Sequence, residues 1–542
     1  MKNLHLRKLI LPIVATSLLV TAPPSTVAIE KARHTTDAAI PARQWDVIDI
    51  AFTVGLPSSH PVDVPFSAVF KGNGAETEVH GFYNGGNEYL LRFTPPTAGA
   101  WIYETRSTVA SLDGLSGGLA VKPAREGRKG GIRVHPESQR RFQYANGDEY
   151  FPIAFESDWL FALDADNPDD IPVTRTFVDH LADNGFNQIV MNVFAYDVTW
   201  AKDPKLKPDH DYGSPRSFPF GGDNEKPDHS RLNIDYFKRL DRVIDYLDRK
   251  GIAAHLMIYV WNKRVNWAEP GSAEDDRYFD HVVKRYQAFP NLVWDVSKEA
   301  LAYGRNDVNY IHERIERLRR LDSFNRLVTV HAYSYCRRFP DKIDFISVQL
   351  WGSELYGVMR QVWKDMPGKP ILNIEHGGYE RGPYVVFEGN YTSPESCLER
   401  AWQCVFAGTY PTHYWQGAAW NVIIPDMESL KPVDRPRLDY YRHLSDFVKQ
   451  HDLGGLKSGD KKSASGFCLH NGGNLMIFYV PKENSHIDVR VGDKQGRRMT
   501  GRWFNPFTGE IEKTFSGKLP RWPRYKKPPG MGFRLLVVEI DG

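Results

Sequence analysis

A helical pattern passes directly into an apolar strand within residues 232–261, LNIDYFKRLDRVIDYLDRKGIAAHLMIYVW. The apolar residues of its first part recur at helical spacing: Ile234, Phe237, Leu240, Val243, Ile244 and Leu247. This spacing gives one apolar face, so we predict an amphipathic helix over residues 232–250. The run IAAHLMIYVW, residues 252–261, is largely apolar and predicts a buried strand. Strands that alternate with helices in this way are typical of an α/β fold with a parallel sheet.

The same alternation extends over residues 142–455. Seven further segments are typical of buried strands: 150–157, 186–197, 291–299, 326–334, 343–351, 369–380 and 412–421. Candidate helices lie at 172–184, 273–288, 306–321, 353–365 and 395–408, with a last helix near 427–450. Eight strands within about 300 residues predict a (β/α)8 TIM barrel rather than an open sheet. The first strand is also not followed by a Gly-rich dinucleotide fingerprint.

The segments on either side of the barrel have a different pattern. Residues 42–122 contain short apolar runs separated by turn residues, which predicts an Ig-like β-sandwich. Residues 123–141 are polar and basic and indicate a linker. Residues 460–542 return to short strands and predict a small antiparallel β-domain. The basic residues of the linker and of the C-terminal domain either lie in solvated loops or attract an acidic polysaccharide.

The N-terminus has the pattern of an export signal. Lys2, Arg7 and Lys8 precede an apolar run over 9–20, and small residues lead to a cleavage site after Ala28. We therefore expect residues 1–28 to be a signal peptide and the protein to be secreted or periplasmic, with an uncleaved anchor as the alternative. Four cysteines in 542 residues do not make a disulfide scaffold. They favour buried thiols, and a single disulfide remains open.

The composition limits the partners. The net charge is only +2, which argues against a protein that holds nucleic acid on a basic surface. The 14 tryptophans include more rings than a core alone requires, and the apolar faces of sugars pack on such rings. We expect a carbohydrate as the partner, no nucleic acid, no membrane contact of the mature chain, no cofactor and no metal.

Two glutamates stand at the predicted carboxyl ends of barrel strands, where barrel enzymes place their reactive groups. Glu299 ends NLVWDVSKE, the fourth strand, and Glu375 ends the apolar part of KPILNIEHGGYE, the seventh. Strands four and seven lie on opposite sides of a barrel mouth. Cleavage of a glycosidic bond needs two carboxyl groups that flank it, one as proton donor and one as nucleophile or base. Glu299 and Glu375 are therefore our candidate catalytic pair.

The two motifs resemble those of clan A glycoside hydrolases, in which strand four carries the acid/base and strand seven the nucleophile. YFPIAFESDWLFAL, residues 150–163, is similar to the first strand of the apiosidase-like branch, which often has a β-sandwich in front and a small β-domain behind. The resemblance implies that Glu299 is the acid/base, that Glu375 is the nucleophile, and that hydrolysis retains configuration. It also implies that Trp420 is the floor of the sugar site. We expect the substrate to be a plant or algal polysaccharide or oligosaccharide.

The sequence departs from this family pattern at two points. Lys298 stands where many clan A members have Asn, and SKE replaces the GGD of apiosidase-like enzymes, so specificity for apiose does not follow. Lys298 favours either an anionic sugar or an outward ion pair. Together with the catalytic pair, polar and aromatic residues at strand ends form the candidate substrate site: Asp158, Trp159, Asn192, Trp261, Lys298, His331, Trp351, His376, Tyr414 and Trp420.

Two other classes of function remain open from the sequence. A non-catalytic carbohydrate-binding surface protein would keep the aromatic residues but would not need two facing carboxylates. A polysaccharide lyase would need a Tyr or His base beside a cation, for which Tyr259 or Tyr333 with Lys298 are candidates. A metal-dependent barrel hydrolase would need clustered ligands such as His-x-His at the first strand, and the sequence has none there.

Overall fold

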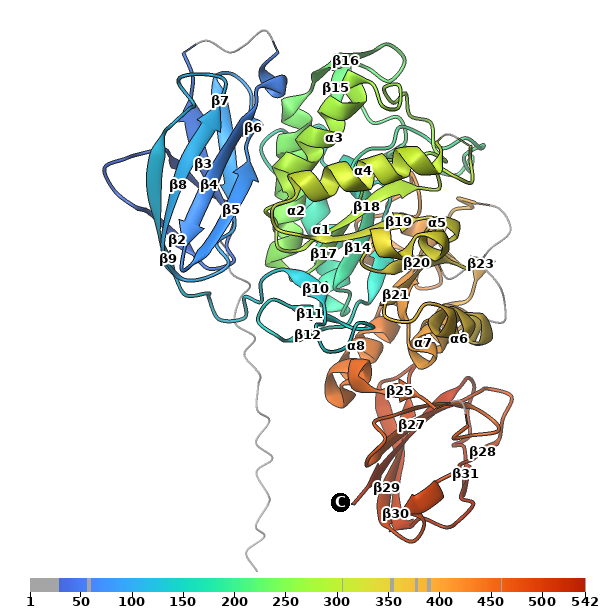
Figure 1. The fold of residues 1–542 in the computed structure, drawn as a ribbon. Coiled ribbons are helices and arrows are strands. Elements are labelled where there is room, and N and C mark those ends of the chain that lie inside the picture. Colours follow the sequence, from blue (N-terminus) through green and yellow to red (C-terminus); the bar gives the residue numbers. More distant parts are fainter. Residues whose placement is uncertain are drawn as a thin grey trace, which may run out of the picture.

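The structure is a computed structural model that describes residues 29–55, 60–304, 306–350, 355–375, 379–387, 391–459 and 461–541. A central barrel lies between an N-terminal β-domain and a C-terminal β-domain (Figure 1). The predicted signal peptide, Trp351 and His376 lie outside the described residues. In the described part of the chain, no helix is long and apolar enough to cross a membrane.

Eight parallel strands form the central sheet, which confirms the predicted barrel. They are β13 (Ala154–Glu156), β14 (Gln188–Asn192), β17 (Ala253–Met257), β18 (Leu292–Lys298), β19 (Leu327–His331), β20 (Ile346–Gln349), β21 (Ile371–Glu375) and β24 (Tyr410–His413). Their order is β19-β18-β17-β14-β13-β24-β21-β20. The two end strands are joined by a side chain, because Thr329 Oγ1 donates to the Phe345 carbonyl at 3.0 Å. The barrel is therefore nearly closed.

Helices cover the outside of this sheet (Figure 1). They are α1 (Pro172–Asp183), α2 (Ile234–Arg249), α3 (Ala273–Tyr286), α4 (Val308–Leu321), α5 (Tyr333–Arg338), α6 (Leu355–Asp365), α7 (Pro394–Ala407) and α8 (Asp439–His451). Asn233 caps α2 by accepting a hydrogen bond from the backbone N–H of Tyr236. The last helix starts later than the predicted 427, because Pro432 and Pro436 prevent a helix before Asp439.

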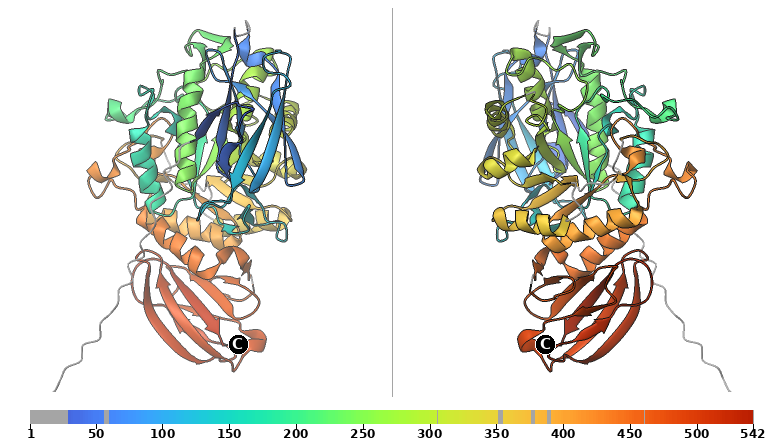
Figure 2. Two further views of the ribbon diagram at one scale, coloured as in Figure 1. Left: turned by 90° about the vertical axis from the view of Figure 1, so that its left-hand side faces the viewer. Right: turned by 90° about the vertical axis from the view of Figure 1, so that its right-hand side faces the viewer.

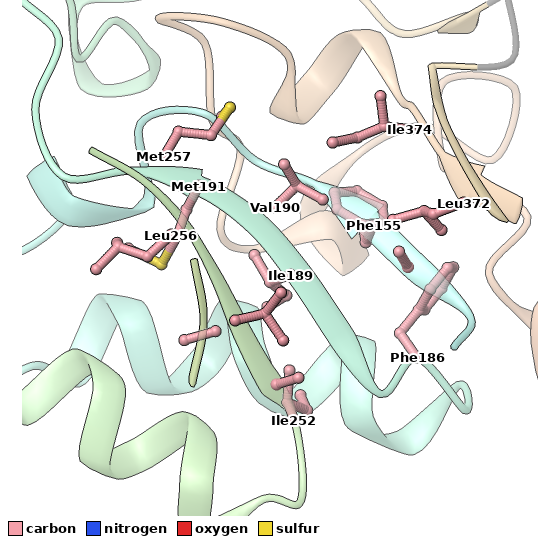
Figure 3. Close-up of a cluster of buried hydrophobic side chains, with 14 of the residues drawn as sticks. Phe155, Phe186, Ile189, Val190, Met191, Ile252, Leu256, Met257, Leu372 and Ile374 are labelled. Atoms are coloured by element: carbon pink, nitrogen blue, oxygen red, sulfur yellow. The ribbon is translucent and has the colours of Figure 1, made fainter. Parts of the chain in front are cut away.

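The core between the strands and the helices is apolar. Figure 3 shows Phe155 of β13, Ile189 of β14, Leu256 of β17 and Leu372 of β21 in one cluster. Because these strands are covered on both sides, their sequences are nearly continuous apolar runs without alternation. This is the property that made them recognisable in the sequence.

The N-terminal domain consists of two packed sheets. One has the order β1-β3-β7-β6 and the other β2-β9-β8-β4-β5. The strands are β1 (Glu30–Arg33), β2 (Ile40–Arg43), β3 (Ile48–Thr53), β4 (Phe66–Gly72), β5 (Ala75–His80), β6 (Phe82–Tyr83), β7 (Glu88–Phe93), β8 (Gly99–Ser107) and β9 (Ser116–Lys122). The sandwich therefore begins before residue 42, with β1 parallel to β3.

The segment between this domain and the barrel is more ordered than a linker. Its strand β10 (Ile132–Val134) pairs with β11 (Phe142–Tyr144), which in turn pairs with β12 (Glu149–Tyr150). Arg128 donates to both carboxylate oxygens of Asp248 at the end of α2, at 2.8 and 2.6 Å. Arg125 lies 3.0 Å from Asp46. These basic residues thus bind the protein itself and do not form a free basic surface.

The C-terminal domain is an antiparallel sheet of order β25-β26-β27-β32-β29-β30 beside the pair β28-β31. Its strands are β25 (Lys457–Ser458), β26 (Phe467–His470), β27 (Leu475–Val480), β28 (His486–Asp488), β29 (Arg498–Asn505), β30 (Glu510–Lys518), β31 (Arg524–Lys526) and β32 (Arg534–Ile540). It lies beyond α8 at the opposite end from the hairpin β15 (Phe220–Gly222) and β16 (Pro227–Leu232) (Figures 1 and 2). The four cysteines are free and buried.

Candidate active site

The two candidate glutamates come together at one end of the barrel. Glu375 is the last residue of β21, and Glu299 directly follows β18. One carboxylate oxygen of each and one ring nitrogen of His331 all lie within 4.8 Å of one another. Glu299 has a left-handed φ of 59°, and its backbone N–H donates to the His331 carbonyl at 3.1 Å. Such a φ is costly for a residue with a side chain and is often found at functional sites.

A buried polar chain inside the barrel holds the end of β18. Tyr150 donates to Gln188 Oε1 at 2.9 Å, and Gln188 Nε2 lies 3.0 Å from His255 Nδ1. His255 Nε2 contacts Asp295 Oδ2 at 3.2 Å, and Asp295 Oδ1 accepts the backbone N–H of His331 at 2.9 Å. The pairing of β18 with β19 shifts register between Asp295 and Lys298. Such a bulge re-aims the strand end that carries Lys298 and Glu299.

Glu375 is surrounded by donors. Lys298 Nζ lies 3.3 Å and His331 Nε2 3.2 Å from its Oε1, and Gln349 Nε2 donates to its Oε2 at 2.7 Å. Burial by itself would raise the pKa of Glu375, but the positive charge of Lys298 and the contact with His331 lower this pKa to about 2. Glu375 is therefore ionised at neutral pH, as a nucleophile must be.

Lys298 points into the barrel. It is 1% exposed, and its Nζ lies 2.5 Å from Glu156 Oε1 and 3.3 Å from Asp158 Oδ1, in addition to Glu375. Burial works against its charge, but these carboxylates raise the pKa of Lys298 well above its ordinary value. Burial raises the pKa of Glu156 strongly, which favours its protonated form. Lys298 is thus an inward ion-pair partner and not the outward one that the sequence allowed.

The surroundings differ among three other residues predicted for the site, Asp158, Asn192 and Trp159. Asp158 accepts a hydrogen bond from the Tyr414 hydroxyl at 3.2 Å, beside Lys298. Asn192 is buried at the end of β14, and neither polar atom of its side chain has a partner among the described residues. Trp159 is fully buried, so its ring packs in the core.

The remaining two predicted rings are nearly buried. Trp261 donates to Ser297 Oγ at 2.9 Å and stacks on Tyr259, with ring centroids 5.6 Å apart. Trp420 has a left-handed φ of 50°, and its ring lies 4.8 Å from the ring of Tyr379. Trp420 therefore belongs to an aromatic wall at the mouth of the barrel, where a sugar platform is expected.

Three residues of the site, Glu156, Gln349 and Lys263, were missing from the predicted set. Gln349 could have been found, because it is a polar residue at the end of the sixth strand. Lys263 stands six positions beyond the end of β17 in the polar sequence NKRVN, where nothing distinguishes it from a solvated loop lysine. The structure buries Lys263 against aromatic rings.

The geometry weighs against the other chemistries. Glu299, His331 and Glu375 are spaced as cation ligands, but the Lys298 ammonium 3.3 Å from Glu375 Oε1 already supplies the positive charge there. Tyr259, a candidate lyase base, donates its hydroxyl hydrogen to Asp275 of α3. Burial raises the pKa of Tyr259 well above its ordinary value, so this hydroxyl is unsuited to act as a base.

Residues 136–453 match the family described as apiosidase-like, catalytic domain, and residues 41–108 match DUF5060, a domain of unknown function. A solved structure of a protein assigned as a glycoside hydrolase from Bacteroides vulgatus ATCC 8482 is similar, with a TM-score of 0.76 and 20% identity, over 93% of this chain and 100% of that chain. A glycoside hydrolase family 5 structure from the same strain has a TM-score of 0.53 and 14% identity, over 76% of this chain and 93% of that chain. No curated protein matches.

Proposed function

The chain belongs to the apiosidase-like family of glycoside hydrolases, and we propose that it is a secreted, retaining glycosidase that acts on a plant or algal polysaccharide or oligosaccharide. The observation that carries this proposal is the spacing of the two catalytic carboxylates. Oxygens of Glu299 and Glu375 lie within 4.8 Å of each other. Retaining glycosidases hold their carboxyl groups about 5–5.5 Å apart, and inverting ones hold them farther apart to admit a water molecule.

The roles of the pair follow from their surroundings. Glu375 is kept ionised by Lys298, His331 and Gln349, so it attacks the anomeric carbon. Glu299 has no cation within contact distance among the described residues, and it donates a proton to the leaving oxygen. The resulting glycosyl ester on Glu375 is hydrolysed by a water molecule that Glu299 deprotonates. Two displacements at one carbon restore the original configuration.

The test compares Glu299→Gln and Glu375→Gln on a panel of natural glycosides and aryl glycosides. Glu375→Gln should lose turnover on every substrate by about a thousandfold or more, because no covalent intermediate forms. Glu299→Gln should lose turnover mainly on natural glycosides, because an activated aryl leaving group needs little protonation. Glu316→Gln, an exposed helix position, is the matched control. Full activity in either site variant would refute the assignment.

The stereochemical outcome and the export are tested separately. Proton NMR of the first product formed should show the anomer of the substrate, and the opposite anomer would overturn the nucleophile role of Glu375. The sequence signal in residues 1–28 supports export of the protein. Mass spectrometry of the protein recovered outside the cytoplasm should show an N-terminus close to Ile29, and an intact N-terminus would contradict cleavage.

A further inference from the structure

Lys263 is a buried cation without a hydrogen-bond acceptor. Its side chain is 1% exposed, and its Nζ has no partner among the residues that the structure describes. The ammonium lies 5.4 Å from the ring centroid of Trp200 and 5.8 Å from that of Trp420. Aromatic faces attract a cation but accept no ordinary hydrogen bond from it. The donors of Lys263 are therefore left for a ligand.

Lys263 belongs to the same mouth of the barrel as the catalytic pair. Trp420, over which its ammonium lies, is part of the aromatic wall at strand eight. Burial lowers the pKa of Lys263 to about 8, against the attraction of Asp158, Glu299 and Glu375. The side chain is thus close enough to sense all three carboxylates but contacts none of them.

The contrast with Lys298 indicates what kind of ligand is missing. Lys298 has three carboxylates within 3.3 Å, whereas Lys263 has no counter-ion in contact. A desolvated ammonium is costly unless an opposite charge is supplied with hydrogen bonds. Asn192, at the end of the neighbouring strand β14, also has an amide without partners. Unsatisfied amide and ammonium donors at the ends of β14 and β17 are suited to a ligand that offers several charged oxygens.

We infer that Lys263 binds an anionic group on the sugar, such as the carboxylate of a uronic acid or a sulfate ester. This inference rests on the proposed function, because it names the substrate class of that site. The carboxylate and the sulfate ester share the chemistry that Lys263 recognises, namely negatively charged oxygens. The sugar ring would then pack beside Trp420, with its anionic group directed to the ammonium.

Monosaccharide binding, measured by calorimetry, tests the role of Lys263 and does not depend on catalysis. The probes are glucuronic and galacturonic acid, their neutral counterparts glucose and galactose, and galactose 6-sulfate. The wild type should bind at least one anionic sugar about tenfold more tightly than its neutral counterpart. Comparison of the uronic acids with galactose 6-sulfate shows whether the site prefers a carboxylate or a sulfate ester. Binding of none of the anionic sugars at millimolar concentration would overturn the inference.

Variants locate the effect at this side chain. Lys263→Met keeps the length and the packing against both rings and should remove the anionic preference, whereas Lys263→Arg should keep part of it. Lys205→Met, an exposed lysine, controls for net charge and should change nothing. Thermal unfolding verifies that each variant is folded. An anionic preference that survives in Lys263→Met would also overturn the inference.

The pH dependence adds a second readout. The ammonium is present below its pKa of about 8 and is lost above it, so the anionic preference should fall between pH 7 and pH 9. Binding of the neutral sugars should not follow this change. If the uronic acid binds through Lys263 but no glycoside is cleaved, the proposed function fails and the inference stands. If neutral glycosides are cleaved and Lys263→Met is without effect, the inference fails alone.

Discussion

Two buried clusters of charged side chains invite comparison, one between the N-terminal domain and the barrel and one in the barrel mouth. Between the N-terminal domain and the barrel, Arg92 donates to Asp49 at 2.7 and 2.9 Å and to Asp241 of α2 at 2.9 and 3.1 Å. Arg285 of α3 donates to Asp241 at 2.9 and 2.6 Å. In this interdomain cluster, two cations and two anions hold one another in bidentate contacts.

In the mouth cluster, the contacts between cations and carboxylates are distributed less evenly. The Lys298 ammonium contacts three carboxylates, whereas the Lys263 ammonium contacts none among the described residues. Glu156 Oε2 and the Asn192 amide are buried without a partner among the described residues. Each such group costs free energy unless another molecule supplies the missing contact. The Lys263 ammonium and the Asn192 amide are therefore candidate contacts for a ligand.

The largest effect is expected when the mouth cluster loses Lys298, the cation that contacts Glu375. In Lys298→Met, Glu375 loses its main counter-ion, its pKa rises, and a protonated Glu375 cannot attack. We expect kcat to fall by about a thousandfold or more at pH 7. Steady-state kinetics on the best substrate measure the effect. Wild-type activity in this variant would mean that Glu375 stays ionised without Lys298.

The corresponding change in the interdomain cluster should act on stability alone. Arg92→Met leaves Asp49 and Asp241 buried with one cation fewer. Breaking a buried ion pair costs about 3–5 kcal/mol of unfolding free energy. Urea unfolding should show this loss, while kcat below the unfolding transition should match the wild type. A large loss of kcat in the folded variant would mean that the N-terminal domain takes part in the site.

The sequence was sufficient for the barrel because strands covered on both faces are continuous apolar runs, as β17 illustrates. It was sufficient to place Glu299 and Glu375 at one end of the barrel, because the ends of barrel strands are a fixed position in the fold. It was insufficient for β10, whose residues Ile132–Val134 lie in a basic segment with the composition of a linker. A strand of three residues is too short to show the alternation of apolar and polar residues that identifies a strand in a sequence.

The sequence also could not predict that the side chain of Lys298 points into the barrel. Side chains alternate along a regular strand, but the register shift between Asp295 and Lys298 interrupts the alternation. Lys263 was missed for a different reason. It lies in a loop, and only the packing of Trp200 and Trp420, which come from distant parts of the chain, buries it. Long-range packing of this kind leaves no local pattern.

A smaller effect is expected from the polar chain that holds the end of β18. Asp295→Asn replaces an oxygen that accepts the backbone N–H of His331 or contacts His255, so the strand end should shift slightly. Small misplacements of catalytic groups cost about tenfold to a hundredfold in kcat. Thr329→Val, at the position of β19 that pairs with Asp295, removes the hydrogen bond to the Phe345 carbonyl and should lower stability but leave kcat unchanged. Equal kcat losses in both variants would contradict a positioning role of Asp295.

The smallest effect should come from Gln349→Leu, which removes one neutral donor from Glu375. The pKa of Glu375 is depressed to about 2 in the folded protein, below its ordinary value of 4.5. Its ionised form therefore stabilises the fold above pH 4.5, and this contribution is lost as the pH falls toward 2. Without Gln349 the pKa rises, so activity should be lost at a higher pH on the acid side. At pH 3 we expect about a twofold loss of kcat/KM relative to the wild type, and at pH 7 a smaller one. Gln361→Leu, on the exposed side of α6, is the control, and an unchanged acid limb in Gln349→Leu would show that Lys298 and His331 alone hold Glu375 ionised.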